Sequence, residues 1–88
     1  MTKKVFPLQS RIVFSPAVIR RVPEEELMDA FSRHSSEDWG VASIELSTRN
    51  QHSLTAGGEI ISEFVSRSGV RFRLTTTSDS HYTEFETV

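Results

Sequence analysis

The last thirty residues of the chain, 59–88, constrain its fold most strongly, because apolar and charged side chains alternate there in steps of two. This period is typical of antiparallel strands with one face toward a core and one toward water. One parity holds the apolar and small side chains Ile60, Ser62, Phe64, Val70, Phe72, Leu74, Thr76, Thr83 and Phe85. The other is rich in charge, with Glu59, Glu63, Arg71, Arg73, Glu84 and Glu86. The pattern predicts three antiparallel strands.

Turn residues set the register of these strands. A three-residue loop at 67–69, with its glycine in the left-handed position, places Phe64 opposite Phe72. A two-residue loop would send an aromatic side chain to the wrong face, so three residues are favoured. A second turn is predicted at Asp79-Ser80. Together the turns also pair Ser62 with Leu74 and Leu74 with Phe85, and they predict a solvent-facing charged row of Glu63, Arg73 and Glu86.

Upstream of residue 59, the sequence predicts one strand and then three helices. The strand is expected at 10–14, at or near a sheet edge because Pro7 precedes it. The helices are expected at 16–22, from Pro23 to residues 35–36, and from 43 to 54, with glycines 57 and 58 ending the last one. The predicted fold is therefore α+β, with three helices packed on one face of a four-stranded, mostly antiparallel sheet in the order β-α-α-α-β-β-β.

Length and composition bound the class of protein. Eighty-eight residues make a single domain, 1–88, of which we expect 1–4 to be disordered. A core this small favours dimerisation, so a homodimer is one expectation. The net charge of −2 lacks the basic footprint of a general nucleic-acid-binding protein. The chain has no cysteine, and it has no apolar run of membrane-spanning length and no signal-peptide core, so we expect a cytoplasmic protein without a membrane partner.

His34, Asp38 and Trp39 form the most chemically suggestive cluster in the sequence. A carboxylate four residues from an imidazole can orient the ring and raise its basicity, as a general base requires. The alternative is structural: a hydrogen-bonded histidine at the end of an apolar helix stripe, and a tryptophan covering the core. Asn50, on the apolar face of the third predicted helix, needs a hydrogen-bond partner if it is buried, and the loop of Trp39 is one candidate.

Two further sets of residues raise the question of catalysis. The three histidines, His34, His52 and His81, lack the spacing of a metal site, so no metal and no cofactor are expected. Arg71, Arg73, His81 and Tyr82 lie on or beside the open face of the predicted sheet. Such groups can hold an RNA phosphate and perform acid–base chemistry, but the neighbouring glutamates would neutralise the arginines.

The run His34-x-x-x-Asp38-Trp39-Gly40 resembles a motif of small bacterial proteins carried on plasmids, prophages and other mobile elements. These proteins are labelled "plasmid-related protein" or, from genomic neighbourhood, type I restriction subunit M. Their pattern is His-x-x-Gly-Asp-Trp-Gly, followed by a helical Asn, a strand and a Thr- and Ser-rich turn. The matching positions are His34, Asp38, Trp39, Gly40, Asn50, Ser53, Leu54, Gly58, Ile60, Ile61, Ser62, Phe64, Thr77, Asp79, Ser80 and Thr83. Glu37 stands where the family has glycine, and the family's Leu-Pro ending is absent.

The resemblance implies a mobile-element accessory protein and identifies no active site. We therefore expect a non-enzymatic protein that binds a host or element-encoded protein, for example an inhibitor of CRISPR or restriction defence. The alternative is a small ribonuclease toxin similar to the RelE/ParE superfamily, suggested by the order of strands and helices. No catalytic residue is assigned. The candidate binding surface comprises Asp38, Trp39, Arg71, Arg73, His81 and Tyr82.

Overall fold

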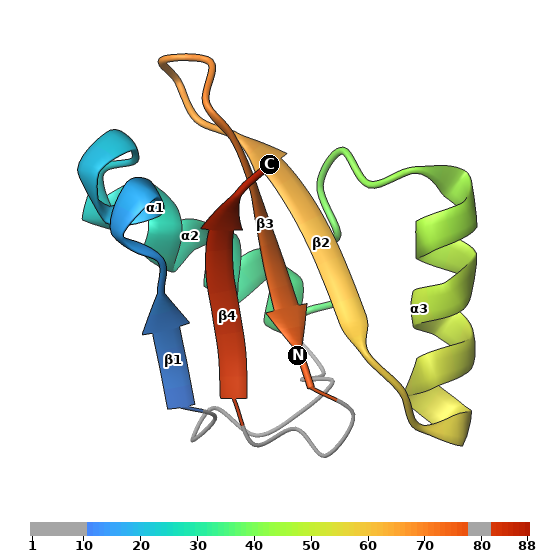
Figure 1. The fold of residues 1–88 in the computed structure, drawn as a ribbon. Helices are drawn as coiled ribbons and strands as arrows, with labels where there is room; N and C mark the ends of the chain where they lie inside the picture. Colours follow the sequence, from blue (N-terminus) through green and yellow to red (C-terminus); the bar gives the residue numbers. More distant parts are fainter. Residues whose placement is uncertain (1–10, 78–81) are drawn as a thin grey trace.

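The computed structural model describes residues 11–77 and 82–88, which form three helices and one four-stranded sheet (Figure 1). The elements follow the chain in the order β1 (Arg11–Phe14), α1 (Pro16–Arg21), α2 (Glu24–Ser35), α3 (Ile44–Ala56), β2 (Ile60–Val65), β3 (Arg71–Thr76) and β4 (Tyr82–Thr87). The α+β class and the order of strand, three helices and three strands are confirmed.

The sheet has the strand order β1-β4-β3-β2. β2, β3 and β4 pair antiparallel, whereas β1 joins β4 in parallel at the edge of the sheet. The predicted register is confirmed, with Phe64 opposite Phe72, Ser62 opposite Leu74, Leu74 opposite Phe85 and Arg73 opposite Glu86. The alternation of side chains in the sequence therefore specified which residues lie opposite one another in β2, β3 and β4.

The loop between β2 and β3 has the predicted three residues. The Ser66 backbone N–H donates to the Val70 carbonyl over 2.9 Å, which leaves 67–69 as the loop. Gly69 has a φ of 91°, in the left-handed region that favours glycine. The turn predicted at Asp79-Ser80 lies outside the described residues, although the register that it implied is observed.

Serine caps begin two of the helices. The Ser15 Oγ accepts from the Val18 N–H at 3.2 Å to open α1, and the Ser43 Oγ accepts from the Leu46 N–H at 3.1 Å to open α3. α3 continues two residues beyond the predicted end and stops before Gly57, which has a φ of 84°. Local hydrogen bonding and glycine thus define the helix ends.

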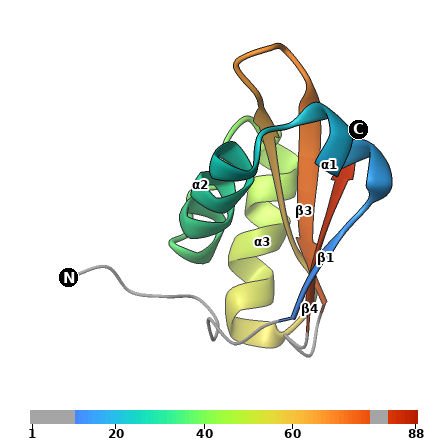
Figure 2. The same cartoon turned by 90° about the vertical axis from the view of Figure 1, so that its left-hand side faces the viewer.

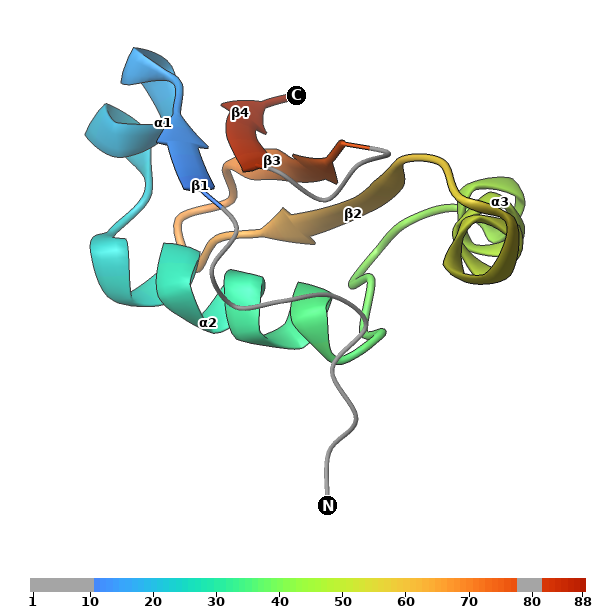
Figure 3. The same ribbon diagram turned by 90° about the horizontal axis from the view of Figure 1, so that it is seen from below.

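The helices differ in how they meet the sheet. Figure 3 shows α2 lying across one face, while α3 runs beside β2 at the edge of the sheet. Figure 2 shows α2 and α3 on the same side of the sheet. The opposite face of the sheet carries no helix within residues 11–77 and 82–88, and we call it the open face.

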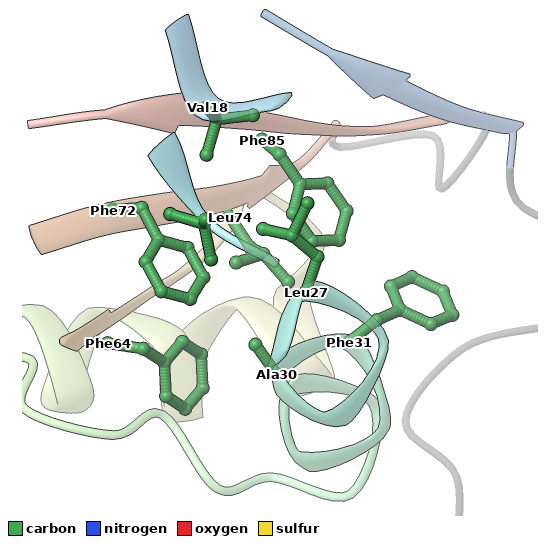
Figure 4. Packing of buried hydrophobic residues seen from close by; sticks show 9 residues of the cluster. Val18, Leu27, Ala30, Phe31, Phe64, Phe72, Leu74 and Phe85 are labelled. Carbon is green, nitrogen blue, oxygen red and sulfur yellow. The ribbon is translucent and has the colours of Figure 1, made fainter. Parts of the chain in front are cut away.

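The main core lies between α2 and the covered face of the sheet (Figure 4). Leu27, Ala30 and Phe31 point from α2 toward the strands, where Leu74 and Phe85 are fully buried. Burying a side chain of this size contributes roughly 2 kcal/mol. A second, smaller cluster joins α3 to β2 and consists of Trp39, Ile60, Ala42 and Leu54.

Candidate functional site

His34 is held in the interior by hydroxyl groups of the sheet. Its ring projects from α2 and is fully buried, with Nδ1 2.6 Å from Ser62 Oγ and Nε2 2.9 Å from Thr76 Oγ1. Thr76 Oγ1 in turn lies 2.7 Å from Thr83 Oγ1. Burial lowers the pKa of His34 to about 4, so the ring is neutral at pH 7. The ring is a core hydrogen-bonding group, and it does not face solvent as a general base would.

Asp38 has different partners from the one that the sequence suggested. Its carboxylate accepts from Arg33 Nε at 2.8 Å and from the Gly40 N–H at 3.1 Å. The hydrogen bond from Arg33 holds the pKa of Asp38 below its ordinary value. The Arg33 guanidinium also lies over the Phe64 ring, 4.8 Å from its centroid. Asp38 therefore fixes the end of α2, while His34 is oriented by the sheet.

The segment 39–41 extends the sheet beyond β2. The Glu63 N–H donates to the Trp39 carbonyl at 3.2 Å, and the Val41 N–H donates to the Glu63 carbonyl at 2.8 Å. Gly40 has a φ of 65°, and a Cβ there would overlap the Glu63 carbonyl oxygen and the Phe64 ring. Only glycine allows this close approach of the two backbones.

Asn50 covers the neighbouring part of the same edge. From α3, its amide Nδ2 donates to the Ile61 carbonyl at 2.7 Å, and its Oδ1 accepts from the Ile61 N–H at 2.9 Å. The side chain thus imitates the backbone of an adjacent strand. Its partner is β2, and the Trp39 loop that the sequence suggested is not bound by it.

The residues of the run His34-x-x-x-Asp38-Trp39-Gly40, with Asn50 and Ser62, thus have architectural roles. They build the end of α2, the corner beside β2 and the buried hydroxyl network. Trp39 was predicted to be a contact residue, but it is only 8% exposed and packs between α3 and β2. Within the described residues its Nε1 has no hydrogen-bond partner. The motif is therefore accounted for by the fold, and Asp38, beside Glu37, keeps an exposed charged side chain.

Arg71 and Arg73 lie on the open face, where a single carboxylate holds both. Arg71 Nη2 is 2.8 Å from Glu63 Oε1, and Arg73 Nη2 is 2.7 Å from Glu63 Oε2. Hydrogen bonds from Arg73 and then Arg71 lower the pKa of Glu63. The predicted row is in register, but both arginines bind Glu63, and among the described residues Glu86 forms no ion pair.

Tyr82, which was also predicted to be a contact residue, does not form one cluster with the arginines. Tyr82 is 41% exposed and starts β4, whereas Arg73 lies opposite Glu86, four residues further along that strand. At about 3.3 Å per residue, this separates Tyr82 from Glu86 by roughly 13 Å. His81 lies outside the described residues. The open face therefore has an arginine end, where Glu86 lies opposite Arg73, and a tyrosine end, with Glu84 between them on β4.

An apolar groove beside β1 was missed in the sequence. β1, α1, α2 and the link between the two helices line it with one charged residue, Glu24, and with Ile12, Phe14, Ile19, Val22, Leu27 and Met28, and its volume is about 350 Å³. Ile19 and Met28 are exposed by 58% and 37%. The available signal was the uninterrupted apolar run at 12–14, which leaves Arg11 as the one polar residue of β1.

Comparisons with protein-family models, with curated proteins and with solved structures gave no match. Among residues 11–77 and 82–88, no three His, Asp or Glu side chains are grouped to hold a metal ion. The same part of the chain contains no helix long and apolar enough to cross a membrane.

Proposed function

We propose that this protein is a non-enzymatic binding protein that recognises a protein partner through the open face of its sheet. The observation that carries the proposal is the engagement of Arg71 and Arg73 by Glu63, which leaves the face with balanced charges. A mixed-charge face with an exposed tyrosine suits a protein surface, where tyrosine and arginine are enriched contact residues.

The balance of charge argues against the ribonuclease alternative. A phosphate-binding site needs cations that are available to the polyanion. Arg71 and Arg73 each donate to one carboxylate oxygen of Glu63. Glu84 and Glu86 on β4 add negative charge to the same face. A phosphate approaching the arginines would have to displace one carboxylate and tolerate two more.

In narrower terms, we propose an accessory protein of a phage or plasmid that inhibits a host defence system such as CRISPR or restriction. The support is the resemblance at His34, Asp38, Trp39 and Gly40. These positions build the corner and the buried network, so the resemblance supports a shared scaffold. On such a scaffold, the residues of the open face determine which partner is bound.

The test is an affinity pull-down of tagged protein from bacterial lysate, with and without nuclease, followed by a purified binding assay. The double variant Tyr82→Ala/Glu86→Arg alters two side chains of the open face. Because single contact residues contribute about 1–2 kcal/mol, we expect its affinity for the captured protein to fall at least tenfold.

Glu45→Arg is the matched control, since Glu45 is exposed on α3, away from the open face, and undergoes the same charge reversal. It should bind as the unmodified chain does. Unchanged binding by the double variant would place the contact surface elsewhere. Recovery of RNA that nuclease abolishes would favour the ribonuclease reading.

A further inference from the structure

The two edges of the sheet are treated differently by the fold. At the β2 edge, Asn50 bonds both backbone groups of Ile61, and segment 39–41 bonds both backbone groups of Glu63. No strand within the described residues pairs with the outer edge of β1. Open edges invite pairing with another chain, which is why proteins usually cover them. Because the β2 edge is covered, the β1 edge is the one that can pair with a strand of another chain.

The β1 edge offers backbone groups and apolar side chains together. The Ser15 N–H donates to the Phe85 carbonyl at 2.9 Å, so Ser15 directs its backbone toward β4. Alternate residues of a strand direct their backbone groups to the same side, and Ile12 and Phe14 must therefore direct theirs outward. The side chains of the same two residues line the apolar groove beneath the edge.

We propose that a second copy of this chain pairs with this edge, β1 against β1 in antiparallel orientation, around a two-fold axis at Val13. In this register Ile12 of each copy lies opposite Phe14 of the other. Both residues have outward backbone groups, so each such pair exchanges two hydrogen bonds. Their side chains fall on the covered face, where the two grooves join, and the two Val13 side chains meet on the open face.

Charge complementarity favours a second copy over an unrelated strand. The same register places Arg11 of one copy opposite Ser15 of the other. Phe14 pairs with Phe85, so Ser15 is level with Glu86 on β4. Arg11 and Glu86 form no ion pair within the described residues, and both belong to the open face. The small Ser15 separates the two, and long side chains can span such a neighbouring position. The two-fold axis forms this pairing twice.

The pairing also explains how an exposed apolar edge is kept from unlimited association. The contact is isologous, so it closes at two copies. The β2 edges at the far ends of the joined sheet are already covered. The product is a continuous sheet made from two four-stranded sheets, with the open faces of both copies on the same side.

Light scattering coupled to size-exclusion chromatography tests the association. We expect the unmodified chain to elute at twice its 10.0 kDa mass. Val13→Arg should elute at half that dimer mass, because two arginines would meet on the axis. Val13 is 39% exposed and lies opposite Glu84, so this variant should fold, as circular dichroism can verify. Ile44→Arg is the matched control on α3, 84% exposed, and should remain dimeric.

A cysteine cross-link tests the register. The chain has no cysteine, so Val13→Cys introduces one sulfur per copy. Non-hydrogen-bonded antiparallel pairs have Cα atoms about 4.5 Å apart, which lies within the disulfide range of roughly 4.4–6.8 Å. Mild oxidation should convert Val13→Cys to a covalent dimer at least tenfold faster than Val65→Cys. Val65 is 51% exposed on the same face of β2 and serves as the control.

Three results would overturn the proposal. The unmodified chain could be monomeric at several hundred micromolar, Val13→Arg could remain dimeric, or the two cysteine variants could cross-link at equal rates. These results are independent of the partner proposed for the open face, which a monomer can also bind.

Discussion

At the scale of single residues, Glu37 links the sequence resemblance to a backbone conformation. The motif that the sequence resembles has glycine at this position, and Glu37 has a φ of 68°, the one positive φ of a non-glycine residue among those described. The left-handed conformation disfavours side chains by roughly 1–2 kcal/mol. The departure from the motif is therefore a local strain at the turn that leads from α2 to Asp38.

Replacing Glu37 with glycine should stabilise the protein. Glycine relieves the left-handed strain but also raises the conformational entropy of the unfolded chain. The free energy gained from the first effect exceeds the free energy lost to the second, so we expect the free energy of unfolding to rise by about 0.5–1 kcal/mol. Urea denaturation measures the change. Glu45→Gly is the control, because glycine within α3 should lower the same free energy by about 0.5–1 kcal/mol. Equal losses in both variants would contradict the left-handed conformation at Glu37.

The partners of Asp38 show why side-chain contacts were harder to predict than backbone structure. A spacing of four residues suggested His34, but Asp38 binds Arg33, five residues away. The helix ends at Ser35 and the left-handed turn at Glu37 redirects the chain, so helical spacing no longer applies. In the same way, both arginines of β3 reach Glu63, because side-chain length allows diagonal as well as direct pairs.

At the scale of the elements, the register of β2, β3 and β4 could be predicted because it is local. Alternating side chains and short turns determine it. The position of β1 beside β4 is non-local, since α1, α2 and α3 intervene before any other strand. Its contiguous apolar residues fit either face, and nothing in residues 11–14 specifies the neighbouring strand. The cover on the β2 edge is also non-local, because Asn50 and Ile61 belong to different elements.

Asn50 offers a prediction about how α3 is held to the sheet. Asn50→Leu preserves the approximate size of the side chain but leaves the Ile61 N–H and carbonyl without their amide partner. Each unsatisfied buried group costs about 1–3 kcal/mol, so we expect the free energy of unfolding to fall by about 3 kcal/mol. Hydrogen exchange at the Ile61 amide should accelerate at the same time.

Gln51→Leu is the matched control for this substitution. Gln51 is the next residue on α3 and is exposed, so its replacement should change stability by no more than about 0.5 kcal/mol. Similar stabilities for the two leucine variants, with an unchanged exchange rate at Ile61, would mean that the amide does not serve as a strand substitute.

At the scale of the whole molecule, two buried or paired groups make stability depend on pH in different ranges. His34 has a pKa of about 4 when folded and about 6.5 when unfolded. The unfolded chain therefore takes up the proton first as pH falls, and stability decreases between pH 6.5 and 4. Glu63 has a lowered pKa, so its contribution is present above its ordinary value near 4.5 and is lost as pH falls below it.

We expect His34 to dominate the loss of stability in the upper range. A difference of 6.5 − 4 = 2.5 pKa units corresponds to about 3 kcal/mol at full protonation of the unfolded chain. Domains of this size have about 5–15 kcal/mol in total, so this loss is a measurable share of the stability of the chain. Urea denaturation at pH 7.0, 6.0 and 5.0, at one protein concentration, measures the slope. In the Val13→Arg background, association would not contribute to it.

His34→Gln should abolish this slope above pH 5, although the variant should be less stable at pH 7 because the contacts to Ser62 and Thr76 are altered. His52→Gln, at an exposed position on α3, should leave the slope unchanged. A slope that persists in His34→Gln would show that another group is responsible. A slope absent from the unmodified chain would mean that water reaches the imidazole in solution. The contacts of the ring with Ser62 and Thr76, between α2 and the sheet, exclude water in the structure.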